Sequence, residues 1–167
     1  MKFLYDIYFS IFNEEISEVR HILNLVRKVD PNFKLLENMR PIIDLANHIA
    51  QIPRIDYGIY SGELSTGKLA HSLELKLERD TVDEIIDVFD KGCTFLREQF
   101  ASFDDEDFLE EKLVAFYEQD QTPKSWSFYL PKIITHLVLH KGILWTYLKA
   151  CLDVDMFTYY GGKFDSE

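Results

Sequence analysis

Hydrophobic residues recur every three or four positions in the first part of the chain. This spacing predicts an amphipathic helix from Leu4 to about Val26, with acidic residues mostly on the opposite side. The sequence Asp30-Pro31-Asn32 is typical of a turn and should end this helix. The positions expected to face the core are Leu4, Ile7, Tyr8, Ile11, Phe12, Val19, Ile22, Leu23 and Val26.

The same spacing predicts a second helix from about Pro41 to Tyr60. Proline tolerates the first turn of a helix, where its missing N–H is not needed. Pro53 removes a backbone hydrogen bond inside the helix, so we expect a kink there, and Gly62 should close the element. Between Ser65 and Arg79, leucines alternate with charged residues, and this period of two predicts a short extended segment.

Two further helices are expected. The third should begin at Asp80 or Thr81, because Thr81 and Glu84 have the spacing of a capping box, and should reach Phe100. The fourth should run from residue 123 or 124 to Leu152, with Pro131 as a possible kink. Its surface is apolar nearly all round, so we expect it to be the most buried helix.

The densest acidic segment separates these last two helices. Asp104 to Asp107, followed by Glu110 and Glu111, is interpreted as a solvated connection. A calcium loop is the alternative, but Phe108 and Leu109 interrupt the acidic run and EF-hand spacing is missing. Together the patterns predict an all-α fold, a four-helix bundle with two long connections, as a single domain over residues 1–167.

Composition narrows the function classes. The chain carries 29 acidic and 18 basic residues, a formal charge of −11, which disfavours binding to nucleic acid or to an anionic membrane surface. We expect no transmembrane segment and no signal peptide, because acidic residues arrive early and no apolar run is long enough. With only Cys93 and Cys151, both thiols should be free and the protein cytoplasmic.

The histidines suggest a chemistry. His136 and His140 are four residues apart on the fourth helix, so their side chains lie about 40° apart on one face and can point at one ion. Two core histidines with hydrogen-bond partners are the alternative. His48 adds a third histidine on another apolar helix, and a shared metal would explain all three. His21 and His71 are interpreted as structural or exposed.

Other polar residues near these histidines have weaker claims. Asp44 precedes His48 by four residues and could orient that ring or complete the ligand set, but it could equally be a surface carboxylate at the helix start. Tyr147 is expected to pack in the core. Cys151 is 11 residues beyond His140, about 16 Å along a helix, and too far to share an ion.

The late run His136-Leu137-Val138-Leu139-His140-Lys141-Gly142, together with a histidine in the second helix, resembles the DinB/YfiT-like family of proposed metalloenzymes. The likeness extends over the helix lengths and long connections, hence nearly the whole chain. The family motif is commonly H-x-x-x-H-[RH]-G-Q. Here Lys141 stands where Arg is usual and Ile143 where Gln is common, so a polar group one turn from the metal is missing.

The resemblance implies an up-down-down-up bundle, frequently a homodimer, with a divalent metal on His48, His136 and His140. Zinc, nickel and iron all accept imidazole nitrogen. It also implies a thiol-dependent transferase or a hydrolase, in which the metal activates a low-molecular-weight thiol or water placed at an open position. The alternative is a non-catalytic bundle that the metal stabilises and that acts as a stress-linked binding module.

Overall fold

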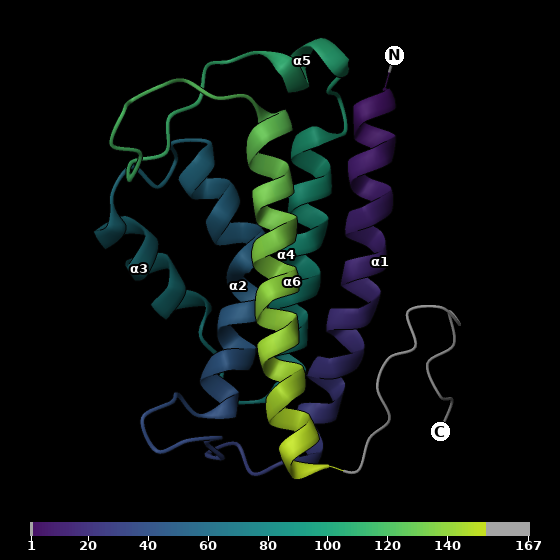
Figure 1. Ribbon diagram of the computed structural model, residues 1–167, viewed down its shortest axis with the longest axis vertical. Coiled ribbons are helices and arrows are strands. Elements are labelled where there is room, and N and C mark those ends of the chain that lie inside the picture. Colours follow the sequence, from purple (N-terminus) through teal and green to yellow (C-terminus); the bar gives the residue numbers. More distant parts are fainter. Residues whose placement is uncertain (1, 153–167) are drawn as a thin grey trace.

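Four long helices form a bundle in the computed structural model, which describes residues 2–152 (Figure 1). They are α1 (Phe3–Leu25), α2 (Ile42–Tyr60), α4 (Val82–Phe100) and α6 (Trp126–Cys151). Three shorter pieces lie between them: a 3-10 turn (Val26–Lys28), α3 (Gly67–Leu77) and α5 (Asp105–Leu109). Within residues 2–152 the extended structure amounts to one isolated bridge, between Leu113 and Lys124. The predicted all-α fold is confirmed.

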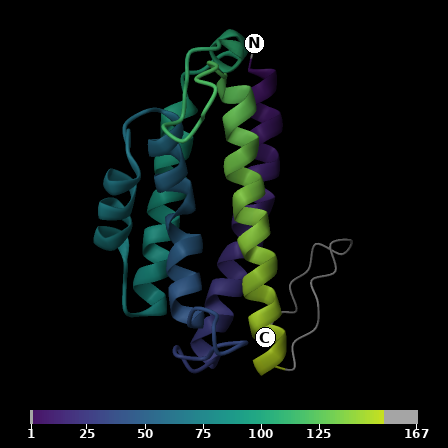
Figure 2. The ribbon, with the colours of Figure 1, turned by 60° about the vertical axis from the view of Figure 1, so that its left-hand side comes forward.

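The helices follow the predicted up-down-down-up order. In Figure 1, α1 and α6 run down the page while α2 and α4 run up. Because α2 and α4 are parallel, the chain must return along the bundle between them, and α3 lies on this return on the outer side of α2 (Figure 2). The second long connection, which contains α5, stays at one end and joins the antiparallel helices α4 and α6.

Several helix ends lie where the sequence predicts them. The Thr81 hydroxyl accepts a hydrogen bond from the Glu84 backbone N–H at 3.3 Å and donates one to the Glu84 carboxylate at 2.7 Å, which begins α4. Pro41 directly precedes α2. Gly62 closes α2 with a φ of 82°, a left-handed conformation that favours glycine. Both α2 and α6 are continuous through their internal prolines, Pro53 and Pro131.

The core is aromatic and aliphatic, and α2 is its most buried helix. Of the 19 residues of α2, 13 are buried, against 10 of the 26 residues of α6. The expectation that α6 would be the most buried was therefore wrong. The reason is tertiary: α3 covers the outer side of α2, whereas Phe128 and Leu139 of α6 face solvent with 42% and 60% of their surface exposed.

The prediction of an extended segment within residues 65–79 was also wrong, because this segment contains the helix α3. Thr66 caps α3 by accepting a hydrogen bond from the Leu69 backbone N–H at 3.2 Å. The inward positions are Ala70, Leu73 and Leu77, which have helical spacing and pack with Ile55, Ile59 and Leu64. Leu75 points away with 58% of its surface exposed, so the alternation of leucines did not mark a buried strand face.

The acidic segment before α6 is partly helical rather than a plain connection. Asp104 accepts hydrogen bonds from the backbone N–H groups of Glu106 and Asp107, and the Asp107 side chain accepts one from the Asp104 N–H in return. The carboxylates of this segment thus cap α5, and Phe108 anchors the helix in the core. Within residues 2–152, the acidic side chains here form no group with metal-binding geometry, and no helix is long and apolar enough to cross a bilayer.

Candidate metal centre

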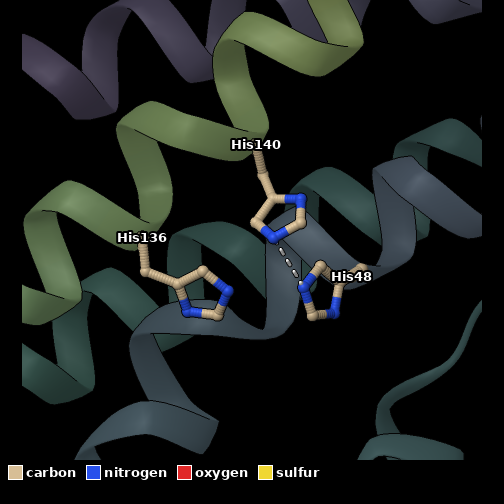
Figure 3. Close-up of side chains that lie close together, drawn as sticks. All are labelled: His48, His136 and His140. Carbon is tan, nitrogen blue, oxygen red and sulfur yellow. Dashed lines mark hydrogen bonds between the residues drawn. The ribbon is translucent and has the colours of Figure 1, made fainter.

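The structure brings together the three histidines that the sequence singled out. Because α2 and α6 are antiparallel neighbours, His48 of α2 lies opposite His136 and His140 of α6 (Figure 3). The ring centroids of His48 and His140 are 4.4 Å apart, and that of His136 lies 5.5 Å from His48 and 4.8 Å from His140. One nitrogen from each ring lies within 4.8 Å of the others, and we call these residues the three-histidine group.

The closest pair of nitrogens has the separation of two ligands on one ion. His48 Nε2 and His140 Nε2 are 3.3 Å apart. Two imidazole nitrogens bound tetrahedrally at about 2.05 Å would lie roughly 3.3 Å apart. The rings of His48 and His140 are thus spaced to share a metal, and His136 is the ring that would have to move inward. The residues present fit a divalent ion bound by imidazole nitrogens.

The electrostatic environment keeps two of the rings neutral near pH 7. Burial, followed by the neighbouring His140, His136 and Arg40, lowers the pKa of His48 to about 4. Burial, followed by His136 and Arg40, lowers the pKa of His140 to about 4 as well. Neutral imidazoles offer the lone pair that a metal ligand needs. Both residues are therefore suited to bind a cation.

The third ring is oriented by a carboxylate that the sequence analysis missed. Asp56 Oδ2 accepts a hydrogen bond from His136 Nδ1 at 2.8 Å, and Asp56 is only 5% exposed. This hydrogen bond raises the pKa of His136, while burial raises that of Asp56. With Nδ1–H donated to the carboxylate, Nε2 keeps its lone pair for an ion. Carboxylates hold metal-ligating histidines in this way.

The antiparallel arrangement of α2 and α6 would have pointed to Asp56. In an antiparallel pair, residues later on α2 lie opposite residues earlier on α6. If His48 faces His140, then His136, one turn earlier, lies toward the later part of α2, where Asp56, about two turns after His48, is the acidic residue. The sequence analysis instead singled out Asp44, four residues before His48, either as a partner of the His48 ring or as a surface carboxylate. Asp44 is exposed, and the carboxylate that accepts a hydrogen bond from a ring of the group is that of Asp56.

His140 differs from His136 in its second nitrogen. His140 Nδ1 is buried and has no hydrogen-bond partner within residues 2–152. If Nε2 of His140 carries the proton, it can donate to His48 Nε2 and leave the Nδ1 lone pair unsatisfied. If Nδ1 carries it, a buried donor is unsatisfied. In either tautomer a buried polar atom of His140 lacks a partner, which costs about 1–3 kcal/mol.

A cavity of about 560 Å³ reaches His48, one member of the three-histidine group, from the side of α3. His48 lies in its wall, together with residues of α2 and of α3. His71 of α3, expected to be structural or exposed, is exposed and lines this cavity, and its Nδ1 lies 3.3 Å from Glu74 Oε2. The side of His48 that faces α3 is therefore accessible to a small molecule.

The remaining candidates lie outside the group. Tyr147 is 1% exposed and donates a hydrogen bond to the Arg40 carbonyl at 3.0 Å, which confirms its place in the core. Both cysteines are free thiols, and burial raises the pKa of Cys93. Lys141, next to His140 in sequence, faces α1 instead and contacts Glu15 Oε2 at 2.5 Å and Glu18. We call Lys141, Glu15 and Glu18 the lysine cluster.

Comparison with known proteins identifies the fold. The sequence matches no family model and no curated protein. The structure is similar to the crystal structure of a proposed member of the DinB family from Exiguobacterium sibiricum 255-15, with a TM-score of 0.66. The alignment covers 90% of this chain and 96% of that chain at 15% sequence identity. At this identity the likeness concerns the fold, so the chain has a DinB-like fold.

Proposed function

We propose that this protein binds a divalent metal ion through His48, His136 and His140. One observation carries the proposal: the 3.3 Å separation of His48 Nε2 and His140 Nε2, with one His136 nitrogen within 4.8 Å of both. The neutral state of His48 and His140 and the Asp56 carboxylate behind His136 support it. Zinc, nickel or iron(II) would suit three imidazoles, and availability would choose among them.

We further propose that the bound metal serves a reaction, as a thiol-dependent transferase or a hydrolase. The described carboxylates and thiols supply no fourth member to the group, and the cavity reaches His48 from the α3 side. A divalent ion with an open position supplies Lewis acidity, which eases deprotonation of a thiol or water. The chain's own residues hold and orient the three rings. A low-molecular-weight thiol as co-substrate, the homodimer and the cytoplasmic location stay predictions.

The alternative proposal is a non-catalytic bundle stabilised by the metal. It rests on the fact that His48 and the pair His136 and His140 belong to different helices, so an ion would cross-link α2 to α6. A structural ion is normally closed by a fourth protein ligand, whereas a catalytic ion keeps an exchangeable position. The accessible side of His48 favours the enzyme.

The first experiment is elemental analysis of the purified protein, followed by thermal unfolding with and without added zinc or nickel. We expect one divalent ion per chain and a rise in the melting temperature, because an ion that binds only the folded state stabilises it. His136→Ala should abolish both effects. His21→Ala, on α1, is the matched control and should keep them. Absence of metal, with no shift on addition, would overturn both metal proposals.

A second experiment separates the enzyme from the structural alternative. Cobalt(II) in place of the native ion reports through its visible spectrum on exchangeable ligands. We expect the spectrum to change when 2-mercaptoethanol is added, because a thiol can reach the open position through the cavity. A spectrum that stays the same at every thiol concentration would favour the closed, non-catalytic site.

A further inference from the structure

We propose that the cavity between α2 and α3 binds a small dipolar molecule, with its positively charged group toward the carboxylates of the cavity and its anionic donor toward Arg40 and the three-histidine group. The inference deepens the proposed function, on which it rests, by naming the charge pattern of the ligand. In the cavity wall, an arginine and several carboxylates lie beside His48 of the candidate metal centre.

The wall of this cavity is held in place by buried polar side chains. Asn47 is 6% exposed, and its side-chain amide makes two hydrogen bonds to the Arg79 backbone. It donates to the Arg79 carbonyl at 2.8 Å and accepts from the Arg79 N–H at 2.9 Å. Gln51, also 6% exposed, donates to the Glu74 carbonyl at 3.2 Å. Both residues line the cavity. They tie α3 and the segment after it to α2, so the space between the helices has a defined shape.

Carboxylates dominate the charge of the cavity. Three carboxylates line it: Asp44 of α2, Glu74 of α3 and Glu78, which follows α3. Among the described residues that line it, Arg40 is the one arginine, and there is no lysine. His71 Nδ1 lies 3.3 Å from Glu74 Oε2 in this wall. A ligand carrying an ammonium group would therefore gain from two or three carboxylates at once, whereas an anionic tail would be repelled.

Arg40 supplies the opposite pole. Arg40 lies two residues before α2 and lines the same cavity as His48. A thiolate or carboxylate entering the open position would be attracted by Arg40 as well as by the ion. An aminothiol, with its sulfur toward the histidines and its ammonium toward Glu74 and Glu78, matches both poles of the cavity.

The test compares three short thiols on the cobalt(II)-loaded full-length protein: cysteamine, 2-mercaptoethanol and 3-mercaptopropionate. Dissociation constants come from the change in the cobalt spectrum. We expect cysteamine to bind about fivefold to tenfold tighter than 2-mercaptoethanol, and 3-mercaptopropionate to bind weakest, because each partly exposed ion pair contributes about 0.2–1 kcal/mol.

The three thiols also differ in acidity, which by itself changes how tightly each binds the ion. Variants of the cavity carboxylates therefore measure the part of the preference that comes from the charge of the cavity. Glu74→Gln with Glu78→Gln should reduce the preference for cysteamine over 2-mercaptoethanol to within about twofold of unity. The single variant Glu78→Gln, at an exposed site, should reduce it partway. Asp87→Asn is the control: it removes an exposed carboxylate that pairs with Lys91 on α4, outside the cavity wall, and should leave the preference unchanged.

The outcomes separate the two proposals. If cobalt and thiols bind but the preference is the same in wild type, in the Glu74 and Glu78 variants and in Asp87→Asn, the dipolar ligand is overturned while the metal site stands. If no cobalt binds, the metal site and the ligand inference fail together. If the preference falls only when Glu74 and Glu78 are neutralised, the charge pattern of the ligand is established.

Discussion

Two neighbouring residues of α6 belong to polar clusters that differ in how far their members satisfy one another. His140 faces α2 and belongs to the three-histidine group, while Lys141 faces α1 and belongs to the lysine cluster. The lysine cluster pairs its charges: the cation contacts two carboxylates, and the side chain of Lys141 is 9% exposed. The three-histidine group leaves His140 Nδ1 buried without a described partner.

The difference teaches how to separate structure from function among buried polar groups. Groups that satisfy one another inside the protein hold helices in place, because breaking them leaves an uncompensated charge. Groups that place lone pairs together do not stabilise one another in the metal-free state, and an ion that binds those lone pairs stabilises the folded protein. By this criterion Lys141 ties α6 to α1, and His140 serves the candidate metal centre.

The largest expected effect is on the lysine cluster. Lys141→Met should lower the free energy of unfolding by about 3–5 kcal/mol, because two carboxylates would remain in a mostly buried place without their cation. Urea unfolding measures this loss. Adding Glu15→Gln and Glu18→Gln to the same chain should recover part of it. A loss below about 1 kcal/mol for Lys141→Met would break the comparison, since the cluster would then behave as an ordinary surface pair.

Asp56→Asn should weaken metal binding about 10–100-fold, because the carboxylate that orients His136 is lost while the side chain keeps its shape. The measurement is a competition titration with a chelator of known affinity. Asp87→Asn is the matched control, because Asp87 is an exposed carboxylate that pairs with Lys91 on α4, and its effect should stay within about twofold. Equal effects of the two variants would show that Asp56 has no special role.

The smallest expected effect on stability is in the three-histidine group, at His140. In metal-free protein, His140→Leu should change the free energy of unfolding by less than about 1 kcal/mol, because it removes a buried nitrogen without a partner together with the hydrogen bond between His140 Nε2 and His48 Nε2. The same variant should lose metal binding. Chelator-treated wild type and variant are compared by urea unfolding. A destabilisation of 2 kcal/mol or more, on the order of a broken buried hydrogen bond, would assign His140 a structural role.

The sequence analysis predicted most of the bundle from local signals. Helical spacing located α1, α2, α4 and α6, and the end signals at Thr81 and Gly62 were confirmed because caps act within a few residues. It failed at α3, where Leu73, Leu75 and Leu77 alternate with the period of a strand, although Ala70, Leu73 and Leu77 have helical spacing. It also misjudged the burial of α6, which depends on which helix α3 covers.

By itself, the sequence determined the helix periods, the caps and the candidate ligands His48, His136 and His140, since spacing along one helix decides which residues share a face. Only the tertiary structure decided the partners across helices: Asp56 for His136, the two glutamates for Lys141, and the cavity beside His48. The register of α2 against α6, and the placement of α3, follow from packing over many residues. No local pattern records them.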